Sequence, residues 1–274
     1  MATKLTLLGL MIYAAMGLWA AALAAYLARR GRTGTALFGL GGVATAAAFV
    51  VRWVQVEHAP LQSLFEVMVC LGMMMFPLWL FARKLLGARG PASAVLLGLV
   101  VLFLAGFVFH AEQQPLPPAL QSWLFIPHVA AYMLAYVILI LAAAQAAMHL
   151  AGSPPGEAGS AGRASQEAPS PRLGTCEQAA FRLVCLGFPL LTLGLVLGAV
   201  WGKLAWGDYW NWDPKELWSL ASWLVYVAYL HIRSRYGGRT ARLNSALAIL
   251  GAVLIVITLL WVNLAVAGKH TYAT

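Results

Sequence analysis

Residues 201–218, WGKLAWGDYWNWDPKELW, place five tryptophans, one tyrosine and a cluster of charged side chains between two long apolar runs. Each tryptophan offers a large flat apolar face and one N–H donor. Asp213, Pro214 and Glu216 predict the first turn of a helix, since they suit the N-cap, the first helical position and a capping box. The stretch is therefore predicted to be an ordered aromatic loop that leads into a helix. An interfacial aromatic belt would explain tryptophans, but not their density beside this charged step.

The composition predicts a membrane-embedded protein. The chain is 62% hydrophobic and 10% charged, against roughly 45–50% and 25% for soluble domains. Its net charge of +9 is spread over short loops, so the expected partner is a lipid bilayer and no nucleic acid. The three cysteines form neither CxxC nor CxxCH, which excludes a dithiol carrier of the thioredoxin type and a c-type cytochrome. The first apolar stretch is too long for a cleaved signal peptide and predicts a retained span.

The predicted fold class is all-α: a polytopic integral membrane protein with eight transmembrane helices in one domain over residues 1–274. A spanning helix requires about 20 mainly apolar residues. Eight stretches meet this condition, namely 5–28, 36–53, 62–82, 92–109, 128–149, 179–200, 215–233 and 244–266. Residues 151–175 are rich in Gly, Pro, Ala and Ser and predict a flexible cytoplasmic linker.

Basic residues predict the orientation of these helices. Most of them fall in the odd-numbered loops: Arg29, Arg30, Arg32, Arg83, Lys84, Arg89, Arg163, Arg172, Arg182, Arg233, Arg235, Arg239 and Arg242. The positive-inside rule places such loops in the cytoplasm. Both termini and the tryptophan-rich stretch at 201–218 are therefore predicted to be periplasmic, in a bacterial inner membrane.

Two further features lie in the predicted spans. Glu66 is an intramembrane carboxylate one turn below Gln62, which is either a functional group with a partner or a residue hydrogen-bonded for packing. Both interpretations stay open. Gly194, Gly198 and Gly202 recur every four residues, a spacing typical of close helix contact in membranes.

Histidines give the candidate metal ligands. His128 opens the fifth predicted span and His270 follows the eighth, so both are expected on the same side as the tryptophan-rich stretch. Two imidazoles facing each other across an aromatic surface are the axial ligands that a six-coordinate haem iron requires. The tryptophans would cover the apolar edge of the macrocycle. Gly207, Asp208 and the N–H groups at the next helix start could meet its polar groups.

His231 predicts a separate site near the cytoplasmic side. It lies roughly 25 Å along the seventh predicted span at 1.5 Å per residue, and Arg233 and Arg235 follow it as candidate partners for propionates. One histidine supplies half of a bis-histidyl site, so a second ligand has to come from elsewhere. His58, His110 and His149 are interpreted as loop or interface polarity.

The segment 206–233, WGDYWNWDPKELWSLASWLVYVAYLHIR, resembles the tryptophan-rich signature of the CcsA (ResC) family, which handles haem in system II cytochrome c assembly. HAPLQSLFE at 58–66, the helix from His128 and AGKHTYA at 267–273 extend this resemblance. It implies that Trp206, Gly207, Tyr209, Trp210, Trp212 and Asp213 contact haem b, bound as ligand or substrate. It further implies that His128 and His270 ligate iron at the periplasmic face. His231 would ligate an intramembrane haem with a histidine of a companion subunit, CcsB (ResB).

The resemblance implies cytochrome c biogenesis: haem is presented at the periplasmic face and attached, with a CcsB/ResB partner, to the CxxCH cysteines of an apocytochrome c. Holocytochrome c synthase activity is expected only within that complex. One alternative is a haem-binding chaperone subunit of the CcmC type, without ligase activity. Another, an electron-transferring subunit similar to cytochrome b, is disfavoured because the outer ligands lie at helix ends beside a loop.

Overall fold

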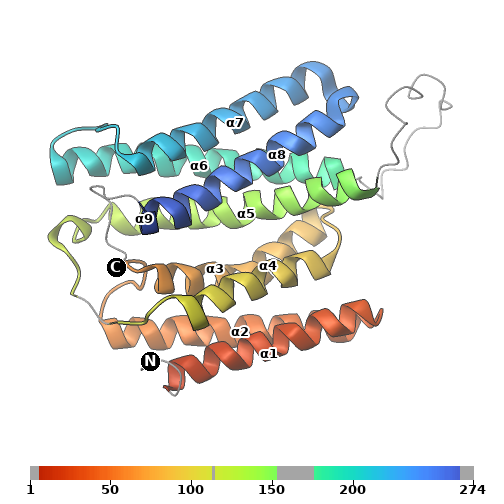
Figure 1. Ribbon diagram of the computed structural model, residues 1–274, viewed down its shortest axis with the longest axis horizontal. Helices are drawn as coiled ribbons and strands as arrows, with labels where there is room; N and C mark the ends of the chain where they lie inside the picture. The colour runs from red at the N-terminus through yellow and green to blue at the C-terminus, as the bar shows by residue number, and fades with distance from the viewer. Residues whose placement is uncertain (1–5, 113–114, 153–175, 266–274) are drawn as a thin grey trace.

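The computed structural model describes residues 6–112, 115–152 and 176–265, and these form helices with no strand among them. Helices α1 to α8 run alternately in opposite directions, side by side, in one bundle (Figure 1). The helices are α1 (Leu7–Leu27), α2 (Gly31–Val56), α3 (Leu64–Phe81), α4 (Pro91–Phe103), α5 (Phe125–Gly152), α6 (Cys176–Trp206), α7 (Pro214–Tyr236), α8 (Ala241–Val256) and α9 (Val262–Ala265). Three π-helical segments, Ala82–Leu86, Leu104–Val108 and Ile257–Trp261, continue α3, α4 and α8.

Seven segments of the described chain are long and apolar enough to cross a membrane. Six of them correspond to α1 through α6, with the π-helical extensions of α3 and α4. The seventh, Pro214–Leu264, contains both α7 and α8, joined by a 3-10 turn at Gly237–Thr240. The helices α7 and α8 lie side by side in opposite directions (Figure 1). The count of eight spans treats them separately and stays a prediction, while the all-α, multi-helix class is confirmed.

Two predicted loop boundaries are wrong. Residues 201–206 are the last residues of α6 rather than part of a loop. They stay helical because Trp201 is buried and its indole N–H donates to the carbonyl oxygen of Ala119 over 2.9 Å, while the glycine at 202 weakens a helix by only about 1 kcal/mol. Similarly, α5 continues through residues 151 and 152. The remainder of the predicted linker, 153–175, lies outside the described residues.

Bulky aromatic side chains fill the core of α1–α4. Trp19 of α1 is fully buried, and its indole N–H donates to the carbonyl oxygen of Phe38 in α2 over 3.0 Å. The Phe38 ring also contacts Trp79 of α3, with centroids 5.3 Å apart. In the second half, α5 is the central helix: it packs against α6 and α8 and also contacts α3. In the N-terminal turn of α5, Phe125 is buried whereas Ile126 is 48% exposed, so one face of this turn packs into the bundle.

The buried carboxylate of Glu66 is part of the packing of α2 against α3. It lies 2.9 Å from the guanidinium of Arg52, also buried. Glu66 completes a capping box with Ser63 at the start of α3. Arg52 also donates to the backbone carbonyls of Ala111 and Glu112. Of the two interpretations of Glu66, these contacts support hydrogen bonding within the bundle.

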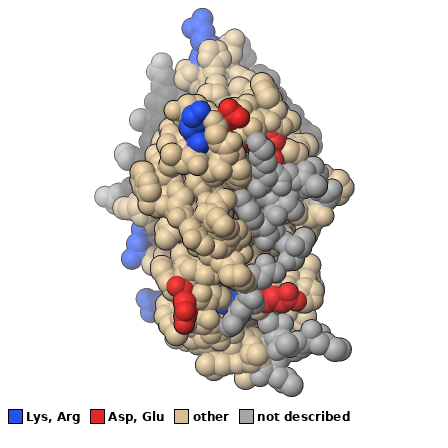
Figure 2. Space-filling view, turned by 90° about the vertical axis from the view of Figure 1, so that its left-hand side faces the viewer, with Lys and Arg blue, Asp and Glu red and all other residues tan. Residues whose placement is uncertain are grey.

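The two ends of the bundle carry different loops. The turns after α1, α3 and α7, which hold or adjoin the basic residues of the first, third and seventh predicted loops, lie at one end (Figure 1). The opposite end holds the connections at 57–63 and 207–213, and the described parts, 109–112 and 115–124, of the connection between α4 and α5. Viewed on that second end, most of the described surface carries no charged side chain (Figure 2).

Candidate functional site

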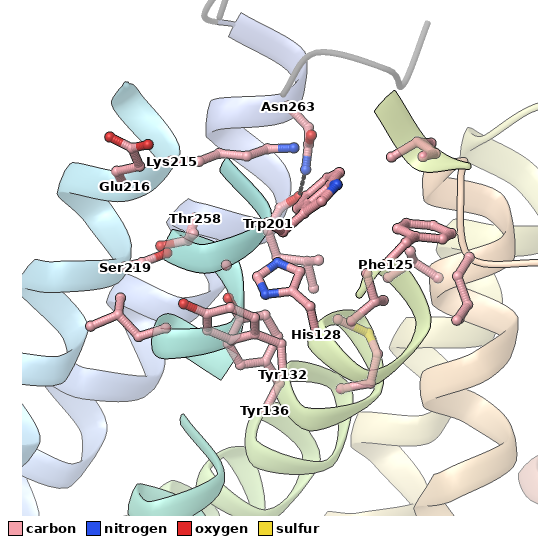
Figure 3. Close-up of a pocket in the computed structure, with 18 of the residues that line it drawn as sticks. Phe125, His128, Tyr132, Tyr136, Trp201, Lys215, Glu216, Ser219, Thr258 and Asn263 are labelled. Carbon is pink, nitrogen blue, oxygen red and sulfur yellow. Dashed lines mark hydrogen bonds between the residues drawn. The ribbon is translucent and has the colours of Figure 1, made fainter. Parts of the chain in front are cut away.

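A cavity of about 180 Å³ lies at the end of the bundle that holds the 207–213 connection. We call it the tryptophan-loop cavity, and the 207–213 segment the tryptophan loop. Its lining comes from α3, α5, α6, α7, the tryptophan loop and the end of α8 (Figure 3). Apart from the residues discussed individually below, the lining is mainly apolar: Leu61, Leu64, Val67, Leu120, Phe125, Val129, Met133, Leu195, Ala199 and Leu259. The site is thus suited to a largely apolar ligand.

His128 projects into this cavity from the first turn of α5 (Figure 3). Its Nδ1 lies 2.8 Å from the carbonyl oxygen of Gly194 in α6. Because a carbonyl oxygen only accepts, Nδ1 carries the proton, and Nε2 is then the basic nitrogen of the neutral ring. The ring packs edge-on against Tyr132, with centroids 5.0 Å apart, and against Trp201 at 5.4 Å. This is a fixed imidazole with a defined tautomer, as metal-ligating histidines require.

The glycines of α6 let this helix approach α5 closely, as their spacing predicts. A Cβ atom at Gly198 would lie 2.6 Å from Cε1 of His128. A Cβ atom at Gly194 would lie 2.9 Å from the ring of Tyr132. Both distances are too short for a real side chain without movement, so these glycines make room for the histidine and the tyrosine.

The capping interactions predicted for the start of α7 are confirmed. Oδ1 of Asp213 accepts from the backbone N–H of Lys215 over 3.0 Å, and Pro214 occupies the first helical position. Oε2 of Glu216 accepts from the backbone N–H groups of Asn211, over 2.8 Å, and Asp213, over 3.1 Å. The hydrogen bonds from the backbone of Asn211 and Asp213 to Glu216 therefore hold the C-terminal part of the tryptophan loop against α7.

The other side of the tryptophan loop is fastened to α6. The ammonium of Lys203 donates to the carbonyl oxygen of Gly207 over 2.6 Å and lies 5.5 Å from the ring centroid of Tyr209. Trp210 and Tyr209 line the cavity. Trp212 has a left-handed backbone, with φ of 57°, and is 68% exposed. Trp210 and Trp212 meet edge to face, with centroids 6.0 Å apart, so one indole faces the cavity and the other the surroundings.

A π-helical segment brings the end of α8 to the cavity. Thr258 and Leu259 lie within Ile257–Trp261, and Asn263 follows it. All three residues line the tryptophan-loop cavity. One-turn π-helices often occur at functional sites because the widened turn changes which side chains face a neighbour.

Other predicted site residues lie elsewhere. Trp206 is the last residue of α6, and its ring packs against Trp201 with centroids 5.3 Å apart, but it is not part of the cavity lining. Gly207 adopts φ of 91°, which turns the chain out of α6. Asp213 is buried and acts as the cap of α7. His270 lies outside the described residues.

His231 is far from this cavity. It lies near the C-terminal end of α7, where its side chain is exposed. The neighbouring Arg233 pairs with Glu177 of α6 over 2.7 Å and lies over the ring of Phe181. Within the described chain, Arg233 therefore joins α7 to α6, and the propionate role predicted for it would compete with Glu177.

Several cavity residues were not predicted from the sequence. Tyr132 and Tyr136 line the cavity together with His128. The three residues recur at four-residue spacing, which places them on one face of α5, and this spacing was available as a signal. No such spacing identifies Ser219, Thr258 and Asn263 in the sequence, because only the tertiary packing of α7 and the end of α8 brings them to the cavity.

Comparison with known proteins assigns this architecture to a family. A family described as "Cytochrome C assembly protein" matches residues 58–270. The protein named cytochrome c biogenesis protein CcsA from Synechococcus elongatus is 33% identical over 87% of this chain and 86% of its own length. The chain belongs to the CcsA family of cytochrome c assembly proteins. A CcsA from Prochlorococcus marinus is 32% identical over 87% of this chain, and one from Gloeothece citriformis 31%.

The fold of this CcsA family member also occurs in a solved structure. The cytochrome c haem lyase CcmF superposes with a TM-score of 0.63 and 22% identity. The match covers 93% of this chain and 46% of the CcmF chain, so this chain spans less than half of that protein. The similarity shows a shared helical arrangement, and together with the CcsA relatives it identifies a multi-pass membrane protein of cytochrome c biogenesis.

Proposed function

We propose that this chain binds haem b as its cargo in the tryptophan-loop cavity and presents it at the periplasmic face of a bacterial inner membrane. There, with a CcsB/ResB-like subunit, haem is attached to the CxxCH cysteines of an apocytochrome c. The observation that carries this proposal is the geometry of His128. Its Nδ1 proton is held by the carbonyl oxygen of Gly194, and its ring faces an apolar cavity.

The described residues fit haem better than a bare metal ion. In the described ranges, no three His, Cys, Asp or Glu side chains lie close enough together to hold a metal ion. A haem iron already has four porphyrin nitrogens and needs only axial ligands. The lining offers an imidazole, aromatic rings and aliphatic side chains. Haem is a flat, mainly apolar molecule, so burial against these side chains would supply much of the binding free energy.

His270 is the second axial ligand in this proposal. It follows Asn263, a residue of the cavity lining, by seven positions. The chain between them is short, which supports an approach of His270 to the same cavity. Two imidazoles would hold the iron until the histidine of CxxCH replaces one of them.

The residues of the chain bind and orient the haem, while the bond chemistry belongs to haem and thiol. Haem supplies two vinyl groups, and each vinyl adds the S–H of one cysteine to form a thioether, with no oxidant required. His128 holds the iron, and Trp210 covers part of the macrocycle and limits access of water. In this proposal the exposed Trp212 contacts an approaching apocytochrome.

The remaining parts of the proposal concern topology and a second site. We place both termini at the periplasm, count α7 and α8 as two spans, and place the basic turns after α1, α3 and α7 in the cytoplasm. His231 would ligate haem at an entry site that it shares with the CcsB/ResB-like subunit. Its exposed position on α7 is compatible with a ligand shared between two chains.

The test is haem retention by purified variants, read by absorbance. Replacing His128 by Gly should lower haem occupancy at least tenfold, and added imidazole should partly restore it by filling the vacant coordination position. The control is His149→Gly, since His149 lies on the same helix at the opposite end. Normal occupancy in His128→Gly would overturn the proposed site. Trp210→Ala should lower occupancy without rescue, because imidazole does not replace lost apolar contact.

A reporter cytochrome c separates attachment from simple delivery. Co-expression with the CcsB/ResB-like subunit should give covalent haem in the reporter, and His128→Gly should abolish it. If haem is bound normally by both subunits but no covalent haem forms, the CcmC-type chaperone function replaces the synthase function in this proposal.

A further inference from the structure

The tryptophan loop has a residue with a left-handed backbone near each of its two ends. These are Gly207 and Trp212, with φ of 91° and 57°. Glycine adopts this conformation readily, whereas a bulky side chain does so at a cost in conformational free energy. Two other described residues with a side chain, Arg29 and Glu57, have a positive φ, but they follow the ends of α1 and α2, where a left-handed residue commonly ends a helix. Trp212 precedes a helix, so its conformation has a different cause.

The carboxylate of Glu216 supplies that cause. Its Oε2 atom accepts from the backbone N–H groups of Asn211 and Asp213, over 2.8 and 3.1 Å, and these are the two neighbours of Trp212. Successive N–H groups around a left-handed residue form a concave site for an anion, and hydrogen bonds to an ionised acceptor are roughly twice as strong as neutral ones. If Trp212 turned to a negative φ, the two N–H groups would no longer converge on one oxygen atom. The hydrogen bonds to Glu216 and the conformation of Trp212 therefore depend on each other.

The carboxylate of Glu216 acts on the tryptophan loop from the side of the site. Figure 3 shows it pointing away from His128. It is thus directed to the backbone around Trp212 and not to the imidazole that the cavity presents.

The segment between the two left-handed residues covers the cavity. Within it, Tyr209 and Trp210 line the cavity, whereas Trp212 is 68% exposed. At the other end, the ammonium of Lys203 donates to the carbonyl oxygen of Gly207 over 2.6 Å. No atom lies within 4 Å of a Cβ placed at Gly207, so the chain has space to turn there. Two rings that face the cavity are therefore carried by a short segment between two left-handed residues.

We propose that residues 208–211 form a lid on the tryptophan-loop cavity, that this lid turns at Gly207 and Trp212, and that Glu216 holds it closed. The inference rests on the proposed function for the identity of the ligand, haem. The two hydrogen bonds to Glu216 favour the closed lid, and the strain at Trp212 opposes them. Such a balance suits a site that has to release its cargo, because a lid without strain would open more rarely. Glu216 is then a positioning residue, which acts on haem through the rings of the lid.

The first experiment measures haem release from the purified chain to an excess of apomyoglobin, followed by absorbance. Trp212→Gly and Trp212→Ala both remove the indole, but only glycine takes a left-handed backbone without strain. We expect Trp212→Gly to release haem roughly fivefold more slowly than Trp212→Ala, because its lid stays closed for longer. With Glu216→Ala added to each, the two should release haem at the same rate, since residue 212 is no longer held in the left-handed conformation.

The same pair of substitutions at Asp208 is the matched control. Asp208 is an exposed residue of the lid and has no positive φ. Asp208→Gly should therefore release haem no more slowly than Asp208→Ala.

Hydrogen exchange of the ligand-free chain tests the lid without haem. The backbone amides of Asn211 and Asp213 should exchange roughly fivefold faster in Trp212→Ala than in Trp212→Gly, and fastest in Glu216→Ala, because exchange follows the population of the open lid. The amide of Tyr226, within α7, should exchange equally in all three.

The outcomes separate the lid from the proposed function. A wild-type chain that binds no haem but shows this order of exchange would contradict the proposed function and support the lid. Equal exchange at Asn211 and Asp213 in the two Trp212 variants, or equal haem release by them, would overturn the lid. Faster exchange at Tyr226 in Glu216→Ala would assign the effect of Glu216 to the cap of α7 and overturn its action on the lid.

Discussion

The two ends of the helical bundle are built differently. At the tryptophan-loop end, charged side chains are used inside the structure: Arg52 pairs with Glu66, and Glu216 fastens the tryptophan loop. At the opposite end Arg233 pairs with Glu177, but basic side chains such as Arg29, Arg30 and Lys84 are exposed. One end encloses a cavity, and the other displays charge.

This difference illustrates two roles of charged residues in a membrane protein, one inside the structure and one on its surface. Buried, paired charges hold backbone segments in a fixed geometry, which a ligand site requires. Exposed basic residues contribute little to packing and act on orientation in the membrane. Alterations at the tryptophan-loop end should therefore affect ligand binding and stability, whereas alterations at the basic end should affect topology or partner contacts.

The largest expected effect concerns the orientation of the two ends. Reporter proteins fused at position 160 and at the C-terminus should report opposite sides of the membrane, with position 160 in the cytoplasm. The reason is the concentration of basic residues in the odd-numbered loops. Paired enzymatic reporters, one active in the cytoplasm and one in the periplasm, provide the measurement. The same side for both fusions would show that the count of eight spans is wrong.

The next largest effect is on stability at the tryptophan-loop end. Glu66→Ala should destabilise the protein by about 3–5 kcal/mol, because it leaves the buried guanidinium of Arg52 unpaired. Thermal unfolding in detergent gives the measurement. Replacing both Arg52 and Glu66 by methionine should be less damaging than Glu66→Ala alone. If the double variant is the less stable of the two, the pair itself contributes net stability and this account is incorrect.

A smaller effect is expected where α5 and α6 approach each other. Gly198→Ala should displace the ring of His128, since the added Cβ would lie 2.6 Å from Cε1. Overpacking of this kind typically changes free energies by about 1–3 kcal/mol, so haem affinity should fall roughly tenfold. Gly17→Ala is the matched control, because no atom lies within 4 Å of a Cβ at Gly17. Equal haem affinities in Gly198→Ala and Gly17→Ala would show that the position of the His128 ring does not affect haem binding.

The smallest effect is expected for His231 in the chain purified alone. His231→Gln should leave haem binding in the tryptophan-loop cavity unchanged, since His231 is exposed near the far end of α7. When the CcsB/ResB-like partner is present, the same variant should lower covalent haem attachment to a reporter cytochrome. Near-normal covalent attachment in His231→Gln would contradict the proposed second haem site at His231, and only the site at the tryptophan-loop cavity would remain in the proposal.

Most of the fold could be predicted from the sequence because membrane helices have a simple signature, about 20 apolar residues. The cap of α7 was also predictable, since Asp213, Pro214 and Glu216 act through local contacts. The extension of α6 through Trp201 was not predictable from the local pattern. It depends on a hydrogen bond to Ala119, which is distant in the sequence.

The candidate site was predicted in part for the same reason. His128 and Trp210 were identified from residue type and position, and both line the cavity. Arg52 was not identified as a partner of Glu66, yet the two side chains form a buried pair. Lys215 was not identified as a site residue, and its side chain borders the cavity. In both cases the local sequence specifies a charge, whereas its partner or cavity is set by packing.

The π-helical segment at Ile257–Trp261 makes the site sensitive to chain length as well as to residue type. A π-helical turn holds one residue more than an α-helical turn. Deleting one residue there would convert the segment to a regular α-helix without removing any apolar character. Asn263 would then rotate by about 100° around the helix axis, away from the cavity it now lines. A relative that is equally apolar in this region but has one residue fewer between α8 and α9 would therefore present a different side chain to the same ligand.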